Sequence, residues 1–212
     1  MQKEQIIQTA LFILDRDGLE GVTLRRLATE LGIKAASLYW HIANKDTLLD
    51  EMANAILLEH FGAFDFENDQ RAWAEWLHTL AHELRAAMLA HREGARVVAG
   101  AHPDIAVMLL KLWELTIRVL YNNGFSYRKA GAITVTVINF TFGSVIEEQA
   151  SPPLAHLNTS KKFLANDNRF PALAAAMEAW QQEDNHLLFD TGVHLLLNGV
   201  RAEHESRNSA AK

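Results

Sequence analysis

Residues 23–42 read TLRRLATELGIKAASLYWHI, which predicts two short helices separated by a tight reversal. Thr23 is of a residue type that caps helix N-termini. Gly32 suits the reversal, because glycine tolerates a positive φ. A second short helix is expected from about Ala35 to His41. The pattern is that of a helix-turn-helix unit, whose inner face carries the apolar residues Leu24, Leu27, Ala28, Leu31, Leu38 and Ile42.

The second helix of this unit has small residues at its front and three rings behind them. Such a helix can lie in the major groove of DNA, where bulky side chains at the front would prevent entry. Ala36 suits contact with a thymine methyl group, and Ser37 can donate to or accept from a base edge. Tyr39 and His41 can bond phosphates, while the Trp40 ring can pack on the sugar–phosphate backbone. These residues indicate a DNA-binding edge.

Basic residues flank this edge. Arg25 begins the preceding helix, from which it can reach a guanine edge or a phosphate. Lys45 begins the next helix, where backbone N–H groups also favour a phosphate. Between residues 23 and 45 four basic residues oppose only Glu30, a local charge of +3 in a chain of net charge −6. The pattern leaves one alternative open, a structural helical hairpin whose aromatic residues lie at a domain interface.

The rest of the chain also reads as helical. Asn44 is expected to cap a helix over about 45–61, and the tract 62–69 reads as a loop. The tract 151–170 is polar and contains prolines, so a long connection is expected there. With no strand pattern, the sequence predicts an all-α fold of about 9–10 helices. Its other helices are expected at about 4–16, 70–90, 94–99, 104–122, 126–150, 170–181 and 184–204.

Composition excludes several classes of protein. The chain has 212 residues, of which 49% are hydrophobic and 22% charged, as in soluble globular proteins. The sequence has no run of about eighteen apolar residues, so no membrane span is expected. The absence of cysteine excludes disulfides and thiolate metal sites and agrees with a cytoplasmic protein. No nucleophile-elbow or glycine-rich phosphate motif is present, so no enzyme chemistry is expected.

A pair of histidines raises the question of a metal site. His78 and His82 are four residues apart and would share one helix face. A zinc protease motif would have glutamate after the first histidine, where this chain has Thr79. The sequence shows no third ligand nearby. Exposed or pocket-edge histidines are therefore favoured, and no metal is expected.

Two later segments are apolar on more than one helix face. They span residues 130–146 and 184–200. Such helices must be buried on several sides. They are either central core helices or the helices that pair with a second copy of the chain. Gly131, Ala132 and Gly143 would permit close approach of a neighbouring helix.

A resemblance to a known family adds to this interpretation. Residues 21–50, GVTLRRLATELGIKAASLYWHIANKDTLLD, resemble the N-terminal domain of the tetracycline-repressor (TetR) family of bacterial regulators. Residues 91–104 and 122–149 are similar to the regulatory core of the tetracycline repressors, so the resemblance covers most of the chain. It implies a three-helix DNA-binding domain at 1–46, a ligand-binding and dimerisation domain at 47–205, and a flexible tail at 206–212.

The resemblance also implies an activity. It implies a cytoplasmic repressor that binds a palindromic double-stranded DNA operator as a homodimer, through helices at about 126–150 and 184–204. A small effector would release it. Leu24 and the Ala35–Ala36 pair replace more polar residues of the family, so a different operator is expected. The expected DNA contacts are Thr23, Arg25, Ala35, Ala36, Ser37, Tyr39, Trp40, His41 and Lys45.

The effector expected from the resemblance is a small, largely apolar molecule. The family's magnesium-binding histidine falls on Val98, and its two drug-clamping polar residues fall on Phe61 and Leu80. Glu147 does match the acidic residue near the metal. Because valine supplies no ligand for a hard cation, no cofactor is expected and a tetracycline–magnesium chelate is disfavoured. The expected pocket residues are Leu80, Leu84, Val98, His102, Pro103, Trp113, Thr116, Asn139 and Glu147.

Two other classes of function remain as alternatives. One is a DNA-binding or architectural protein without a small-molecule effector. The other is a helical enzyme or carrier that retains the hairpin. Salt-dependent, sequence-selective DNA binding would separate the last from the others.

Overall fold

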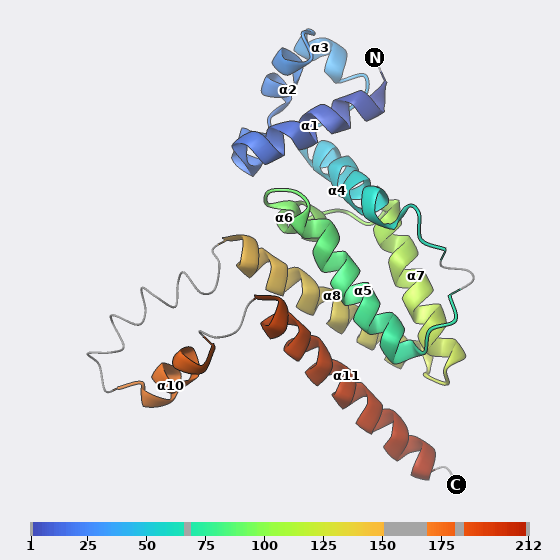
Figure 1. Ribbon diagram of the computed structural model, residues 1–212. Coiled ribbons are helices and arrows are strands. Elements are labelled where there is room, and N and C mark those ends of the chain that lie inside the picture. The colour runs from blue at the N-terminus through green and yellow to red at the C-terminus, as the bar shows by residue number, and fades with distance from the viewer. Residues whose placement is uncertain (1, 66–68, 151–168, 181–184, 211–212) are drawn as a thin grey trace.

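A computed structural model of the chain describes residues 2–65, 69–150, 169–180 and 185–210, and within these ranges every regular element is helical. Figure 1 shows a small N-terminal unit joined by one helix to a larger bundle. The helices are α1 (Lys3–Asp17), α2 (Leu24–Glu30), α3 (Ala35–Leu38), α4 (Lys45–Phe61), α5 (Trp73–Leu89), α6 (Gly94–Ala99), α7 (Val107–Asn122), α8 (Tyr127–Ala150), α10 (Pro171–Trp180) and α11 (Asn185–Ala210), with a short 3₁₀ turn, η1 (Leu19–Gly21).

The turn and caps expected in the N-terminal unit are confirmed. Thr23 Oγ1 accepts a 3.2 Å hydrogen bond from the Arg26 amide, and Asn44 Oδ1 accepts one of 2.8 Å from the Thr47 amide. These bonds satisfy amides that the first turns of α2 and α4 leave unpaired. Gly32 has a φ of 65°, the left-handed conformation that the reversal needs.

Three boundaries differ from the sequence expectation. The helix α3 ends at Leu38, and Tyr39 to His41 continue as a turn in which the His41 amide donates to the Leu38 carbonyl at 2.9 Å. The 3₁₀ turn before α2 was not predicted. The helix α11 extends to Ala210, beyond the end expected at about residue 204. No glycine or proline follows Gly199, so nothing in the sequence stops the helix there.

The helix α4 belongs to both halves of the molecule. It packs against α1 in the N-terminal unit and against α5, α6 and α7 in the bundle. One continuous apolar core therefore extends from Ile6 in α1 to Val145 in α8. The buried apolar residues of α4 are Leu48, Met52, Ala53, Ile56, Leu57 and Phe61, all at most 2% exposed.

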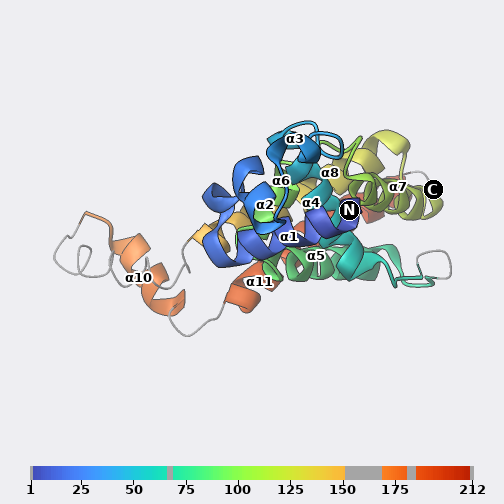
Figure 2. The same cartoon turned by 90° about the horizontal axis from the view of Figure 1, so that it is seen from above.

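A second apolar core holds α11 against α5, α7 and α8. Phe189 and Val193 of α11 are buried in this core together with Trp76 and Leu77 of α5. Gly192 lies so close to Phe140 of α8 that a Cβ there would be 2.3 Å from the ring. The helices α8 and α11 are thus tightly apposed, whereas both views place α10 away from the bundle (Figures 1 and 2).

Among the described residues, α8 is the one helix of at least 18 residues that contains a strongly apolar 18-residue window. Its 18-residue window reaches a mean hydropathy of 1.4, enough by length and composition to cross a membrane, although core helices pass the same test. It packs against α5, α6, α7 and α11. Thr134 and Thr141 are fully buried and donate to carbonyls one turn back in α8. These contacts are those of a core helix.

We predict that Leu57→Ala lowers the free energy of unfolding by about 2–5 kcal/mol, because it opens a cavity in the core that both units share. Urea unfolding followed by circular dichroism, at fixed protein concentration, measures this loss. Leu58→Ala is the matched control, since Leu58 is 45% exposed and its truncation should change stability by only about 0.5 kcal/mol. Equal losses in the two variants would contradict a core centred on α4.

Candidate nucleic-acid interface and effector pocket

The helix-turn-helix has its apolar side inward and its rings outward. Leu38 is 1% and Ile42 0% exposed, whereas Trp40 is 86% and Tyr39 56% exposed. Neighbouring exposed apolar groups mark interaction sites more often than scattered single ones do, so these two rings form a candidate contact surface. The helix α3 that precedes them lies at the free end of the N-terminal unit (Figure 1). All nine expected DNA contacts are exposed: Thr23, Arg25, Ala35, Ala36, Ser37, Tyr39, Trp40, His41 and Lys45.

The basic residues of this surface differ in their partners. Arg26 is paired with Asp17, with 2.9 Å between Nη2 and Oδ2. In the described part of the chain no carboxylate pairs with Arg25, Lys34 or Lys45. Their charges are therefore available to an anionic partner, as phosphate contacts require.

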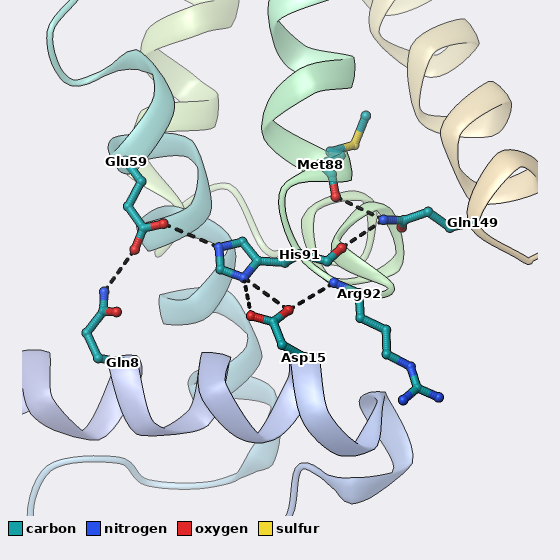
Figure 3. Close-up of polar contacts among 7 residues, drawn as sticks. All are labelled: Gln8, Asp15, Glu59, Met88, His91, Arg92 and Gln149. Carbon is teal, nitrogen blue, oxygen red and sulfur yellow. Dashed lines mark hydrogen bonds and ion pairs between the residues drawn. The ribbon is translucent and has the colours of Figure 1, made fainter. Parts of the chain in front are cut away.

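A polar junction ties the N-terminal unit to the bundle (Figure 3). The His91 ring lies between α1 and α4, with Nδ1 3.0 Å from Asp15 Oδ2 and Nε2 3.3 Å from Glu59 Oε2. The Arg92 amide donates to Asp15 Oδ1 at 3.0 Å. Gln149 of α8 donates to the His91 carbonyl at 2.8 Å. None of these residues was expected from the sequence to have a role, although His91 lies in a segment that carries the family resemblance.

A second junction lies between α4 and the segment after α6. Asp50 is only 2% exposed, and its Oδ1 accepts from the His102 amide at 2.8 Å. The His102 ring adds a contact, with Nδ1 3.2 Å from Asp50 Oδ2, while 66% of its side chain stays exposed. Further along, Asn54 Oδ1 accepts from the Met108 amide at 2.9 Å. His102, an expected pocket residue, thus contacts α4, the helix that joins the N-terminal unit to the bundle.

The other expected pocket residues lie in several environments. Leu80, Leu84 and Val98 are buried in the main core. Pro103 is half-buried in the segment after α6, and Asn139 and Glu147 are exposed on α8. The sequence expectation of one shared pocket is therefore not met by all nine residues.

Two expected pocket residues carry buried polar groups. Thr116 Oγ1 accepts from Trp76 Nε1 at 3.3 Å and donates to the Leu112 carbonyl at 2.7 Å. The Trp113 indole N–H is buried and has no acceptor among the described residues. A buried donor without a partner calls for an explanation, and a bound molecule that accepts from it is one.

Two hollows are each lined by one of the expected pocket residues. A narrow one of about 10 Å³, close to the room that one water needs, is lined by Phe61, Phe64, Arg71, Trp76, Thr79, Leu80 and Glu83. The Arg71 guanidinium donates to Asp69 and lowers the pKa of that carboxyl. A hollow of about 420 Å³ between α8 and α11 is lined by Phe140, Gly143, Ser144, Glu147, Glu148, Leu188, Phe189 and Gly192. Leu80 and Glu147 therefore line different hollows.

These residues do not fit a magnesium chelate. Val98 is 0% exposed and surrounded by apolar side chains, so it supplies neither a ligand nor a path to one. Phe61 and Leu80 line the same narrow hollow and make it apolar where a drug-clamping pair would be polar. Glu147 lies on α8 beside the other hollow.

The exposed faces of α8 and α11 carry unusual apolar surface. Val135 of α8 is 41% exposed, and Leu187 and Leu195 of α11 are 47% and 70% exposed. A Cβ built on Gly131 or Gly143 would meet nothing within 4 Å. These faces are therefore open to another helix pair.

Comparison with known families identifies both halves. The model for bacterial regulatory proteins of the tetR family matches residues 6–52, and that for the tetracyclin repressor-like C-terminal domain matches residues 67–204. The tetracycline repressor protein class C of Escherichia coli is 35% identical over 202 residues, which cover 94% of this chain and 90% of that repressor.

Two solved structures from Streptomyces coelicolor share the fold. A possible TetR family transcriptional regulator is 34% identical, with a TM-score of 0.80 over 95% of this chain and 99% of that one. ActR, crystallised with (S)-DNPA, is 28% identical, with a TM-score of 0.78 over 96% and 98% of the two chains. The helix-turn-helix, the bundle of α5 to α11 and these matches agree, and the chain belongs to the TetR family of bacterial transcriptional regulators.

Proposed function

We propose that this regulator is a homodimeric repressor that binds a palindromic DNA operator and is released by a small, largely apolar effector. It acts in the bacterial cytoplasm. Residues 1–46 form the DNA-binding unit, and residues 47–205 form the effector-binding and dimerisation unit. The observation that carries the proposal is the outward edge of α3 and its following turn, where Trp40 is 86% exposed.

The shape of this edge suits the major groove of DNA. Ala35, Ala36 and Ser37 form a narrow exposed front that can approach base edges. Tyr39, Trp40 and His41 stand beside it, at positions suited to sugar and phosphate contacts. The unpaired cations Arg25 and Lys45 extend the edge on both sides, as an anionic backbone requires.

The proposed dimer uses the exposed faces of α8 and α11. Four helices, two from each copy, would cover Val135, Leu187 and Leu195. The small residues Gly131 and Gly143 allow the helices to approach closely. Such a dimer has to place its two α3 edges about 34–36 Å apart to reach successive major grooves.

The proposed switch works through the two junctions. An effector bound between α5, α6 and α7 shifts the segment of α6 and His102, and Asp50 passes this shift to α4. Because α4 carries the N-terminal unit, the separation of the α3 edges then changes. About 1–3 kcal/mol of coupling suffices to change operator affinity about 5- to 150-fold.

We expect Trp40→Ala to lower affinity for DNA upstream of the regulator's own gene at least about fivefold while leaving thermal stability unchanged, since the ring packs on nothing inside the protein. Arg25→Ala should also weaken binding and, if Arg25 contacts a phosphate, reduce the slope of log affinity against log salt by about 0.9. Fluorescence anisotropy at several salt concentrations measures both effects.

Arg118→Ala on α7 is the matched control, because it removes the same charge from an exposed site far along the sequence from α3. It should leave affinity and slope unchanged. If Trp40→Ala and Arg25→Ala bind as well as the parent protein, the α3 edge is not the DNA-binding surface.

The His91 junction yields a separate prediction. Asp15→Asn weakens the contacts to His91 and the Arg92 amide, so the N-terminal unit is held less firmly. We expect operator affinity to fall about threefold to tenfold, with a stability loss of about 1 kcal/mol because the pair is partly exposed. Asp104→Asn, also exposed, controls for the lost negative charge. A junction without a role would leave the two variants alike.

The effector is sought by thermal-shift screening of small apolar compounds with the purified dimer. A true effector should raise the melting temperature and lower operator affinity in the same range of concentration. Trp113→Phe removes the unpaired indole N–H. It should lower the affinity for the effector and leave the affinity for DNA unchanged. Compounds that stabilise the protein but never change operator affinity would favour the DNA-binding protein without an effector.

A further inference from the structure

Three histidines contact one aspartate where α11 packs against α5, and a fourth, His186, lies beside His82. His78 and His82 are one turn apart on α5, and Asp190 lies one turn after His186 and one turn before His194 on α11. The two helices are packed side by side (Figure 1). The sequence showed no third ligand near the α5 pair, and that reading is wrong, because Asp190 lies more than a hundred residues further along the chain.

The three central side chains converge on one point. Asp190 Oδ1 is 2.9 Å from Nε2 of His78 and 2.9 Å from Nε2 of His82. The three atoms all lie within 4.8 Å of one another. An ion about 2.0–2.2 Å from each atom fits this arrangement after small side-chain rotations.

The surroundings hold the three side chains in place. His194 Nδ1 is 3.0 Å from the backbone carbonyl of Asp190, its hydrogen-bond partner one turn back, and 3.2 Å from the second carboxylate oxygen. The Phe189 ring lies edge-on to His82, with 5.1 Å between the ring centroids. The nearby Arg85 is paired with Glu148, with 2.6 Å between Nη2 and Oε1. Its charge is thus compensated and does not repel a cation.

The ligand types select the class of ion. Two imidazole nitrogens with one carboxylate oxygen are a set that zinc and its neighbours bind, whereas magnesium and calcium require oxygen ligands. The side chains are 37%, 18% and 27% exposed for His78, His82 and Asp190. The cluster is therefore open enough for an ion to enter and for water to fill a fourth position.

Protonation states agree with this geometry. Burial, and then the neighbouring His78, lower the pKa of His82, which favours the neutral ring that binds metals. Although burial acts in the opposite direction, hydrogen bonds from His78 and His82 lower the pKa of Asp190, which favours the carboxylate. An ion competes with a proton for the Nε2 atoms of both histidines, so ion binding is expected to weaken as the pH falls.

We propose that His78, His82 and Asp190 bind one divalent transition-metal ion per chain, with zinc as the favoured ion. The ion joins α5 to α11, which is one of the two helices that each chain contributes to the proposed dimer interface. This site is separate from the narrow hollow beside Leu80 and from the α3 edge, so it is tested without DNA or an effector.

The test titrates zinc chloride into the chelator-treated full-length protein at about pH 7.5, followed by calorimetry and thermal unfolding. We expect one ion per chain and a rise in melting temperature of about 5–10 °C at a hundred times the dissociation constant. Magnesium chloride should give neither. His82→Asn and Asp190→Asn should each lose most of the zinc affinity, because each removes one of the three ligands.

His60→Asn is the matched control, because His60 is a partly exposed histidine that also faces one carboxylate, Glu83. It should bind zinc as the parent protein does. Cobalt provides a second readout, since intense visible absorption reports a tetrahedral site. The proposal is overturned by the absence of stoichiometric zinc binding, or by affinity that His82→Asn and Asp190→Asn leave unchanged. Neither result would affect the proposed repressor function.

Discussion

The burial of α4 from two sides is the constraint on which the rest of the structure depends. A helix whose apolar residues face both α1 and α6 cannot turn without exposing one set of them. The N-terminal unit is therefore not a separate body on a flexible tether. Its orientation follows from the packing of α4, and the Asp50 and His91 junctions add directional bonds to that packing. Because α4 contacts both α6 and α1, a displacement of α6 either moves α4, and with it the N-terminal unit, or is opposed by the packing of α4.

Local features of the fold could be predicted from the sequence because each depends on neighbouring residues. Gly32 predicted the reversal, and Thr23 and Asn44 predicted the two caps, because capping involves residues only three positions apart. The exposure of Trp40 followed from the spacing of Leu38 and Ile42 on the opposite face. The early end of α3 could not be predicted, since the turn after it retains helix-like hydrogen bonds and the same residue pattern.

Long-range contacts could not be predicted in this way. Asp15 and His91 are far apart in sequence, as are Asp50 and His102, and no periodicity links such pairs. For the same reason, the sequence did not indicate that Asp190 lies beside the two histidines of α5. Phe61 and Leu80, which the resemblance aligned with the two drug-clamping residues, line one hollow. Two other residues expected at the pocket, Asn139 and Glu147, lie on α8. Within a single chain, α8 presents these two side chains to solvent.

The absence of a Cβ at Gly192 has a consequence for the spacing of half-sites that the proposed dimer can bind. Because Phe140 fills the space where a Cβ would lie, α8 and α11 are held close together. In the proposed dimer, two such helix pairs would set the distance between the two α3 edges. Adjustment is then left to α4 and its junctions. A dimer with a fixed distance between its α3 edges would tolerate a changed base within a half-site more readily than an extra base pair between the half-sites. The extra base pair moves one half-site away from the other and also rotates it around the DNA axis.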